Sequence, residues 1–171
     1  MASAFYRHSI TSPIGPLTLI VDRTGAVVRI NFGSSLALPA DLSPIEDNKY
    51  VCGQLAWELD EYFHGKRTDF SLEILPRGSD FQKSIWSYLR KVPYGITISY
   101  GELARRSGRK GAARVVASAV ANNPIPIIIP CHRILPAHGG IGLYALHHLP
   151  AAEGTRMKAI LLSLEAAHRQ P

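Results

Sequence analysis

The sequence predicts an α/β amino-terminal domain, residues 1–76, and a mostly α carboxy-terminal domain, residues 77–171, that contains a helix-turn-helix. Three observations predict this arrangement. Short β-rich runs and one amphipathic helix fill the first part, helix-capping motifs punctuate the second, and the net charge changes sign between them. With 171 residues, 46% of them hydrophobic and 19% charged, the chain is long and apolar enough for two small packed cores.

The amino-terminal part is predicted to be an antiparallel β-meander. Its three strands are expected over Phe5–Ile10, Leu17–Asp22 and Val27–Phe32. The segments between them, 12–16 and 23–25, contain the Gly, Pro, Ser and Thr residues that favour turns. A polar loop with prolines follows over residues 34–47, and residues 70–74 are expected to form a further strand.

One amphipathic helix is predicted over Lys49–His64, with Gly65 ending it. Its apolar residues recur at helical spacing: Val51, Leu55, Leu59 and Phe63. Cys52 lies one residue from this stripe, and we expect it to be a buried core thiol without chemistry.

Capping residues and glycines divide the carboxy-terminal part into helices. Ser79 and Gln82 form a capping box that opens a helix reaching about Lys91, and Ser99 and Glu102 form a second that opens a helix over 100–107. A third helix is expected over 111–122. The last two, joined by four residues, have helix-turn-helix proportions, although an αα-hairpin within a core has the same spacing.

The charge distribution favours a nucleic-acid partner for the second part. Residues 1–76 hold 6 Lys/Arg against 9 Asp/Glu, a net charge of −3, whereas residues 77–171 hold 13 against 4, a net charge of +9. Basic surfaces bind polyanions through phosphate neutralisation and counterion release, although a solvated or membrane-facing surface is an alternative. The third predicted helix presents small residues and one long cation, Arg114, which suits close approach to a groove.

The candidate reactive residue is Cys131. An apolar, proline-rich run over 124–130 delivers it directly before His132 and Arg133, and neighbouring cationic groups favour the nucleophilic thiolate. The alternative is a packed core thiol. A histidine that acts as a base needs a carboxylate to orient it, and the last segment offers only Glu153 and Glu165.

Several classes of protein are disfavoured by composition. Two cysteines cannot form a disulfide scaffold, the first residues lack the charged head and apolar run of a secretory signal, and the apolar run 125–129 is too short to span a bilayer. We expect a cytoplasmic protein that does not enter membranes. The spacing of His138, His147 and His148 fits no standard metal site, so no metal and no cofactor are expected.

At these motifs the chain resembles the O6-alkylguanine-DNA alkyltransferases, also called methylated-DNA–protein-cysteine methyltransferases. The most specific match is the run 130–133, Pro-Cys-His-Arg, preceded by Asn-Pro-Ile-Pro at 123–126. Further matches fall in family order along most of the chain: 12–15, 17–18, 80–82, 93–95, 99–100, 112–114 and 161–165. The resemblance implies a ribonuclease-H-like amino-terminal domain and a carboxy-terminal domain that binds the minor groove of double-stranded DNA.

The resemblance also implies a reaction, in which a flipped guanine gives its O6-alkyl group to Cys131 in a single, suicidal turnover. O4-alkylthymine is an expected second substrate, and the protein is expected to act as a monomer. His132 would be a water-mediated base, Glu165 would orient it, Asn123 would brace the active-site turn and Tyr100 would bind the guanine. The DNA-binding residues implied are Arg114, as the residue that fills the gap in the base stack, with Ala113, Val115, Ala117, Ser118 and Arg133. The implied pocket residues are Pro126, Ile134, Tyr144, Ala145 and Lys158.

The chain departs from the family pattern after Tyr144. Where the family has a short Gly-rich link, residues 145–154 form a longer segment that we expect to be a mobile lid ending at Gly154, with the Ala145 N–H directed at O6. Val115, Ala117 and Ser118 also stand where smaller residues are common.

Two other functions share parts of this pattern. A Cys-His-Glu hydrolase would use the same nucleophile with many turnovers but needs no basic helix-turn-helix. A DNA-damage sensor would bind without transfer, and Cys131 argues against it. Transfer of one methyl group to Cys131 distinguishes all three.

Overall fold

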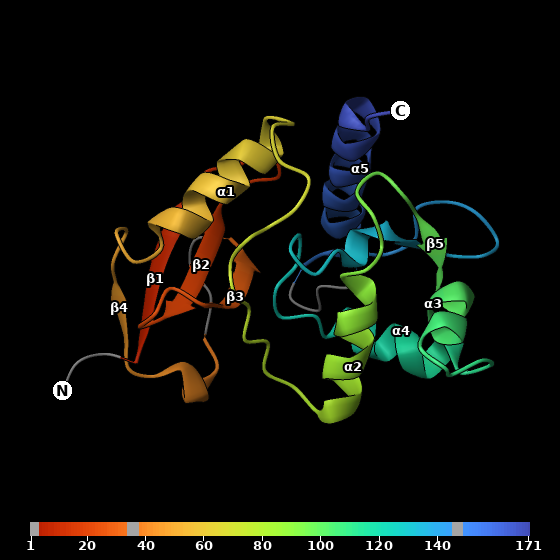
Figure 1. Ribbon diagram of the computed structural model, residues 1–171, viewed down its shortest axis with the longest axis horizontal. Coiled ribbons are helices and arrows are strands. Elements are labelled where there is room, and N and C mark those ends of the chain that lie inside the picture. The colour runs from red at the N-terminus through yellow and green to blue at the C-terminus, as the bar shows by residue number, and fades with distance from the viewer. Residues whose placement is uncertain (1–3, 34–37, 145–148) are drawn as a thin grey trace. The chain divides into compact units, whose positions relative to one another are not determined.

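The computed structural model describes residues 4–33, 38–144 and 149–171 (Figure 1). The chain divides into two compact units, Met1–Arg77 and Gly78–Pro171, which we call unit 1 and unit 2. An antiparallel meander with a helix forms unit 1, and unit 2 is mainly helical, so the predicted fold class is confirmed.

Unit 1 is built on a four-stranded sheet in the order β3-β2-β1-β4. The strands β1 (Phe5–Ile10), β2 (Leu17–Asp22) and β3 (Val27–Phe32) form the predicted meander at the predicted bounds. The turn residues set these ends: Ser12 and Gly15 bond each other across the first turn, and the Asp22 carboxylate accepts from the backbone of Thr24 and Ala26 in the second.

The other end of the sheet differs from the expectation. The segment expected to be an entirely irregular loop contains a 3-10 turn, Ala40–Leu42, and a short strand, β4 (Ile45–Asp47), parallel to β1. Residues 70–74, expected to be a strand, contribute only one bridge, between Ile74 and Val27. In both segments the outcome depends on how far the residues pair with strands distant in sequence: residues 45–47 pair with β1, whereas residues 70–74 make a single bridge to β3. Local composition does not report such pairing.

Both faces of the unit 1 sheet are covered. Figure 1 shows α1 (Gly53–Phe63) across one face, where it buries Leu55, Leu59 and Tyr62. The other face packs Phe5, Ile20 and Val28 against Leu42 of the 3-10 turn. Nearly every residue of β2 is therefore buried, as expected for a central strand. Cys52 is fully buried at the start of α1, which confirms the expected core thiol.

Unit 2 follows the predicted punctuation. Its helices are α2 (Asp80–Leu89), α3 (Tyr100–Arg106), α4 (Ala113–Ala121) and α5 (Ala151–His168). Ser79 and Gln82 form the complete capping box predicted for α2. Ser99 caps α3, but the Glu102 side chain binds Arg105 and Arg106 and does not complete the second box.

The pair α3 and α4 forms the helix-turn-helix, and α4 also packs against α2. The buried Trp86 indole N–H donates to the Ala119 carbonyl at 2.9 Å, which ties α2 to α4. In the turn between α3 and α4, Gly108 adopts a positive φ of 73° that ends α3. Two-residue strands, β5 (Ile98–Ser99) and β6 (Ile134–Leu135), pair in parallel and connect α3 to the segment after α4.

No helix in the described part of the chain is long and apolar enough to cross a membrane.

Candidate active site

The segment between α4 and α5 carries Cys131 on a fully buried turn. Residues 123–130 are all buried, and the Ile129 N–H donates to the Ile125 carbonyl at 2.9 Å to close the turn. Ile127 has a φ of 77°, a conformation that is costly for a β-branched residue and that persists only where the surroundings impose it. The active-site turn therefore holds strain at Ile127, next to the candidate nucleophile.

Asn123 braces this turn. Its amide N–H₂ group donates to the Ile129 carbonyl at 2.7 Å and to the Cys131 Sγ at 3.0 Å, while its carbonyl oxygen accepts from the Ile125 N–H at 3.0 Å. All three bonds are buried, so each is protected from competition by water. Asn123 thus fixes the turn and directs one donor at the sulfur.

Cys131, His132 and Arg133 form one turn of 3-10 helix, Cys131–Arg133. Successive side chains on a 3-10 helix are about 120° apart, so the three residues leave the backbone in different directions. An extended segment would point successive side chains to opposite faces, whereas this turn separates Cys131 and His132 by only about 120°.

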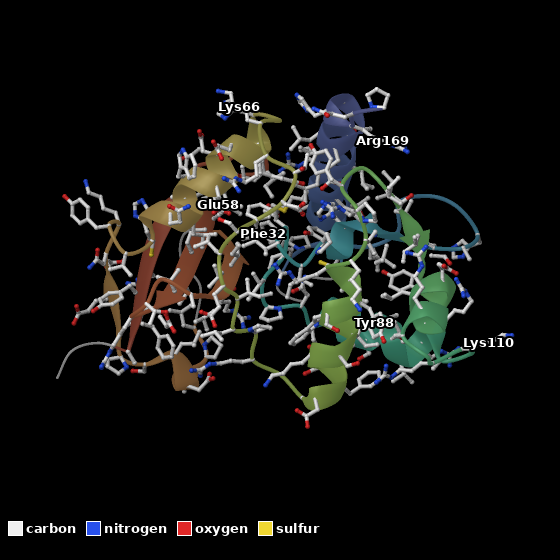
Figure 2. All side chains as sticks on the ribbon, viewed as in Figure 1. Phe32, Glu58, Lys66, Tyr88, Lys110 and Arg169 are labelled. Carbon is white, nitrogen blue, oxygen red and sulfur yellow. The ribbon has the colours of Figure 1, made fainter. Side chains whose placement is uncertain are left out.

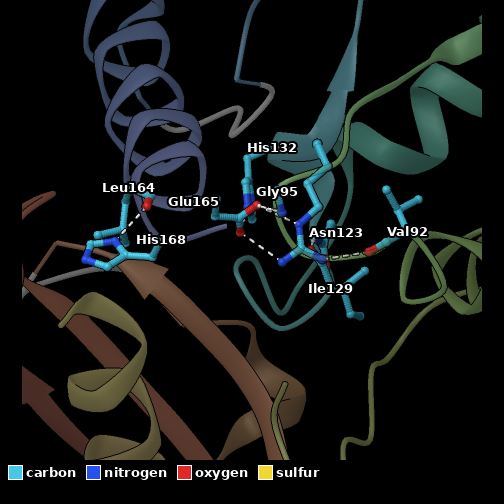
Figure 3. A network of polar contacts seen from close by, with 9 residues as sticks. Val92, Gly95, Asn123, Ile129, His132, Leu164, Glu165 and His168 are labelled. Atoms are coloured by element: carbon cyan, nitrogen blue, oxygen red, sulfur yellow. Dashed lines mark hydrogen bonds and ion pairs between the residues drawn. The ribbon is translucent and has the colours of Figure 1, made fainter. Parts of the chain in front are cut away.

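Glu165 of α5 is the carboxylate that binds His132. Its Oε1 lies 2.7 Å from the His132 Nε2, and its Oε2 accepts from the Gly95 N–H at 3.1 Å. Figure 3 shows Glu165 extending from α5 toward His132 and Gly95. The Glu165 and His132 side chains are both buried. Glu153, the other carboxylate considered from the sequence, is exposed, so Glu165 is the partner of His132.

Arg133, which the resemblance implies as a DNA-binding residue, binds Glu165 in this structure. Its Nε donates to Oε2 at 2.9 Å and its Nη2 to Oε1 at 2.8 Å, while Nη1 donates to the Val92 carbonyl at 2.7 Å. Every nitrogen of the guanidinium is used within unit 2, and only 7% of the side chain is exposed. A buried cation needs such partners, and the three bonds hold the guanidinium within unit 2.

The carboxylate fixes the tautomer of His132. Burial tends to raise the pKa of Glu165, but the hydrogen bonds and charges of His132 and Arg133 outweigh it and hold the pKa well below its usual range. An ionised carboxylate can only accept, so the His132 Nε2 carries the hydrogen. The Nδ1 of the neutral ring then keeps its lone pair. This Nδ1 is buried and has no hydrogen-bond partner in the described part of the chain.

His132 and Cys131 both rest in their neutral forms. Burial lowers the pKa of His132, more than the hydrogen bond and charge of Glu165 raise it. Burial also raises the pKa of Cys131, against the opposing effects of the Asn123 and Tyr144 hydrogen bonds and the Lys158 charge. The sequence favoured a resting thiolate, whereas the structure holds a thiol beside a neutral imidazole that is free to take its proton.

Three further predicted residues lie near the thiol. Burial, and after it the negative charge that Cys131 carries as a thiolate, raises the pKa of the half-buried Tyr100, so the Tyr100 phenol stays protonated. Tyr144 is buried and lowers the pKa of Cys131, against the effect of burial. Lys158 of α5 is buried, its Nζ donates to the Ile134 carbonyl at 2.7 Å, and burial lowers its pKa to about 8. The structure therefore brings the predicted catalytic set together around Cys131.

Two other predicted pocket residues, Pro126 and Ile134, are buried in the active-site turn and in β6. Ala145 lies outside the described residues. The start of α5 corrects the predicted lid: the helix begins at Ala151, so Gly154 lies within it. A Cβ at Gly154 would stand 2.9 Å from the Tyr144 carbonyl oxygen, so glycine there permits close packing of α5 against Tyr144.

The predicted DNA-contacting residues of α4 share one face. Arg114, Val115 and Ser118 are exposed, and Ala113 and Ala117 are half-buried, whereas Val116, Ala119 and Val120 face the core. Arg109 stacks on the Phe81 ring, with 4.9 Å between the guanidinium carbon and the ring centroid, and it donates to the Ser107 carbonyl. Lys110, in contrast, projects from the α3–α4 turn (Figure 2). Arg114 and Lys110 are the cations that this surface leaves available.

Sequence reasoning did not identify Val92 and Gly95 as part of the site. Both contribute backbone groups, a carbonyl to Arg133 and an N–H to Glu165. Gly95 adopts a positive φ of 72°, and its position after Pro93-Tyr94 indicated only a turn. No side-chain chemistry marks such backbone donors, so only the fold reveals them.

Comparisons with known proteins find one family over both units. The family model for the 6-O-methylguanine DNA methyltransferase ribonuclease-like domain matches residues 5–76, and that for the DNA binding domain matches residues 80–167. The methylated-DNA–protein-cysteine methyltransferase of Methanosarcina acetivorans is 36% identical over 162 residues, which cover 95% of this chain and 99% of that protein. The corresponding protein of Mycolicibacterium paratuberculosis is 37% identical over 161 residues, which cover 94% and 92%.

Solved structures agree as well. The crystal structure of Mycobacterium tuberculosis O6-methylguanine methyltransferase has a TM-score of 0.83 and 35% identity, with coverage of 97% of this chain and 95% of that one. Mycobacterium tuberculosis OGT in complex with DNA has a TM-score of 0.82 and 34% identity, with coverage of 95% and 94%.

Proposed function

Because this chain belongs to the 6-O-methylguanine DNA methyltransferase family, we propose that Cys131 is the residue that accepts the alkyl group from damaged DNA. The protein repairs DNA by transferring an alkyl group to a cysteine. The observation that carries the assignment is the buried relay: Cys131 shares one 3-10 turn with His132, whose Nε2 lies 2.7 Å from the buried Glu165.

The proposed step is an in-line displacement. The Cys131 sulfur attacks the alkyl carbon, a carbon–sulfur bond forms, and the bond between that carbon and O6 breaks with its electron pair left on the guanine. The thiol proton passes through a water to the His132 Nδ1. The Tyr100 hydroxyl, protonated at neutral pH, donates to the guanine and offsets the charge that the leaving base acquires.

The product of the proposed reaction explains why each molecule acts once. The product is a thioether, which is no longer a nucleophile, and no second cysteine lies in unit 2 to take the group away. The buried Lys158, whose charge opposes the burial effect on Cys131, stabilises the sulfur as its proton leaves. O4-alkylthymine, which carries its alkyl group on an equivalent exocyclic oxygen, is a proposed second substrate.

The proposed DNA-binding and alkyl-transfer domain spans residues 77–171, one residue more than unit 2, and the proposed supporting domain spans residues 1–76. We propose that the exposed face of α4 enters the minor groove of double-stranded DNA and that Arg114 fills the gap left by the flipped base. One chain holds the whole relay, so a monomer suffices for the reaction, and the cytoplasm, or the nucleoid within it, is the proposed place of action.

The test is the number of methyl groups transferred per chain from duplex DNA that contains O6-methylguanine. The expected result is one methyl group per chain and none for Cys131→Ser, whose hydroxyl the relay does not ionise. Cys52→Ser is the matched control and should still take one. Repeated turnover would instead support a hydrolase, and tight binding with no transfer by the unaltered protein would support a damage sensor.

A further inference from the structure

Arg133 is a buried cation whose hydrogen bonds lie within unit 2, and the reaction described above does not use it. Its three nitrogens make three buried hydrogen bonds, two to Glu165 and one to the Val92 carbonyl. Burying a guanidinium costs free energy that a neutral side chain of similar shape would avoid. A charge in this place therefore calls for an explanation beyond packing.

We propose that Arg133 is a positioning residue for alkyl transfer: its forked donors fix the Glu165 carboxylate so that His132 is held with its Nδ1 lone pair ready for the thiol proton. The proposal rests on the proposed function of Cys131 and deepens it. Arg133 touches neither the thiol nor the alkyl group in this account, and it acts only through Glu165.

The Arg133 fork fixes the orientation of the Glu165 carboxylate. Each oxygen of Glu165 accepts two bonds: Oε1 from His132 and the Arg133 Nη2, and Oε2 from the Arg133 Nε and the Gly95 N–H. Parallel donors of one planar guanidinium hold both oxygens at once. Without this fork the carboxylate loses a pair of donors that holds both oxygens together and is freer to turn away from the imidazole.

Arg133 also favours the neutral form of His132. Burial is the largest cause that lowers the pKa of the imidazole. Among the charged groups, Glu165 raises this pKa, and Arg133 and Lys158 lower it. Tyr94 also faces this cluster, since its ring centroid lies 5.6 Å from the Arg133 guanidinium. The Arg133 charge offsets the effect of the Glu165 charge on the pKa of His132, so the imidazole stays neutral and can act as a base.

Two variants separate charge from geometry. Arg133→Gln removes the charge and keeps one donor, whereas Arg133→Lys keeps the charge and loses the fork. The measurement is the single-turnover rate of methyl transfer from duplex DNA, from about pH 5 to about pH 9, where protonation of the His132–Glu165 pair sets the acid limb.

For Arg133→Gln we expect a rate at the plateau at least about tenfold lower and an acid limb moved up by about one pH unit, because loss of a nearby positive charge lets the pair bind a proton more readily. For Arg133→Lys we expect a lower plateau with the acid limb in place, because the charge remains. The matched control is Arg67→Gln in unit 1. Arg67 also pairs with a glutamate, Glu61, and donates Nη1 to a backbone carbonyl, and its loss should leave the profile unchanged.

An Arg133→Gln profile that is lower at every pH with the same midpoint would overturn the proposal, since a merely structural role predicts that result. If the Gln variant does not unfold cooperatively, Arg133→Lys decides: a wild-type rate and profile in that variant would equally overturn it. Absence of transfer by the unaltered protein would instead contradict the proposed function, so the two failures are distinguishable.

Discussion

Glu58 in unit 1 and Glu165 in unit 2 are both fully buried glutamates on helices, and they differ in the groups that bind them. The Glu58 carboxylate accepts from Gln54 at 3.0 Å, from the Ser71 N–H at 3.0 Å and from the Ser71 hydroxyl, with the Arg67 Nη1 at 3.5 Å. Glu165 instead binds a histidine that directly follows a cysteine in sequence. A buried carboxylate thus serves packing in unit 1 and, in the proposed reaction, proton transfer in unit 2, and the difference is one titratable partner.

The two cysteines show the same contrast. Burial raises the pKa of Cys52 to about 11, and no other group opposes it. Burial also raises the pKa of Cys131, but Asn123, Tyr144 and Lys158 all favour its thiolate. Both thiols are neutral at rest. Only Cys131 has neighbours that stabilise the sulfur when a base removes its proton, so the surroundings rather than exposure make the difference.

The strongest way to break this comparison is to neutralise each glutamate. Glu165→Gln should lower the methyl-transfer rate on the order of 10²-fold, because the amide neither fixes the His132 tautomer nor stabilises the imidazolium that forms. Glu58→Gln should leave the rate within about twofold and lower the free energy of unfolding by about 1–3 kcal/mol, the usual cost of a disturbed buried hydrogen-bond acceptor. Single-turnover assays and urea unfolding measure the two effects, and similar rate losses in both variants would contradict the contrast.

Lys158 gives the comparison a pH dependence. Its pKa, lowered by burial to about 8, means that it loses its proton within a range where an exposed lysine stays charged. The transfer rate should therefore fall as pH rises through about 8, because the charge that favours the Cys131 thiolate disappears.

The variant that checks this assignment is Lys158→Met, which should be about tenfold slower near neutral pH and show no such fall. Lys66→Met, which alters an exposed lysine of unit 1, should keep the wild-type profile. A wild-type rate that keeps rising through pH 9 would show that the Lys158 charge does not assist transfer.

A smaller effect should separate the DNA-facing surface of unit 2 from unit 1. Arg114→Ala should slow transfer from duplex DNA several-fold, about three- to tenfold, and hardly affect transfer from the free O6-methylguanine base, because only the duplex needs its stack filled during flipping. Lys66→Ala should change neither rate. Equal slowing on both substrates would show that Arg114 acts on the chemistry and not on the duplex.

Local sequence signals predicted the regular elements well. The bounds of β1, β2 and β3 were predictable because turn residues flank each strand, and α2 was predictable because its capping box is complete. The strand β4 was missed because its parallel pairing with β1 is a long-range contact. The first turn of α5 was missed because a glycine such as Gly154 usually indicates a loop. In this helix the glycine is required because a Cβ at position 154 would lie too close to the Tyr144 carbonyl oxygen.

The candidate site was predictable where side-chain chemistry marks it. Cys131, His132 and Glu165 were identified as candidates from their residue types, and the resemblance added Asn123, Tyr100, Tyr144 and Lys158. The bonds between Arg133 and Glu165 were not predicted, because a sequence shows a charge but not its burial. The backbone donors at Val92 and Gly95, and the protonation state of the resting thiol, depend on the folded surroundings and have no signature in the sequence.

The most direct test of this account is to locate the transferred methyl group by mass spectrometry of peptides, after the protein reacts with duplex DNA that contains O6-methylguanine. The protein has two buried cysteines, one in each unit, so each serves as the internal control for the other. We predict one methyl group on the Cys131 peptide and none on the Cys52 peptide. A methyl group on Cys52, or an unmodified Cys131 in protein that has repaired the DNA, would contradict the assignment of the reactive thiol to unit 2.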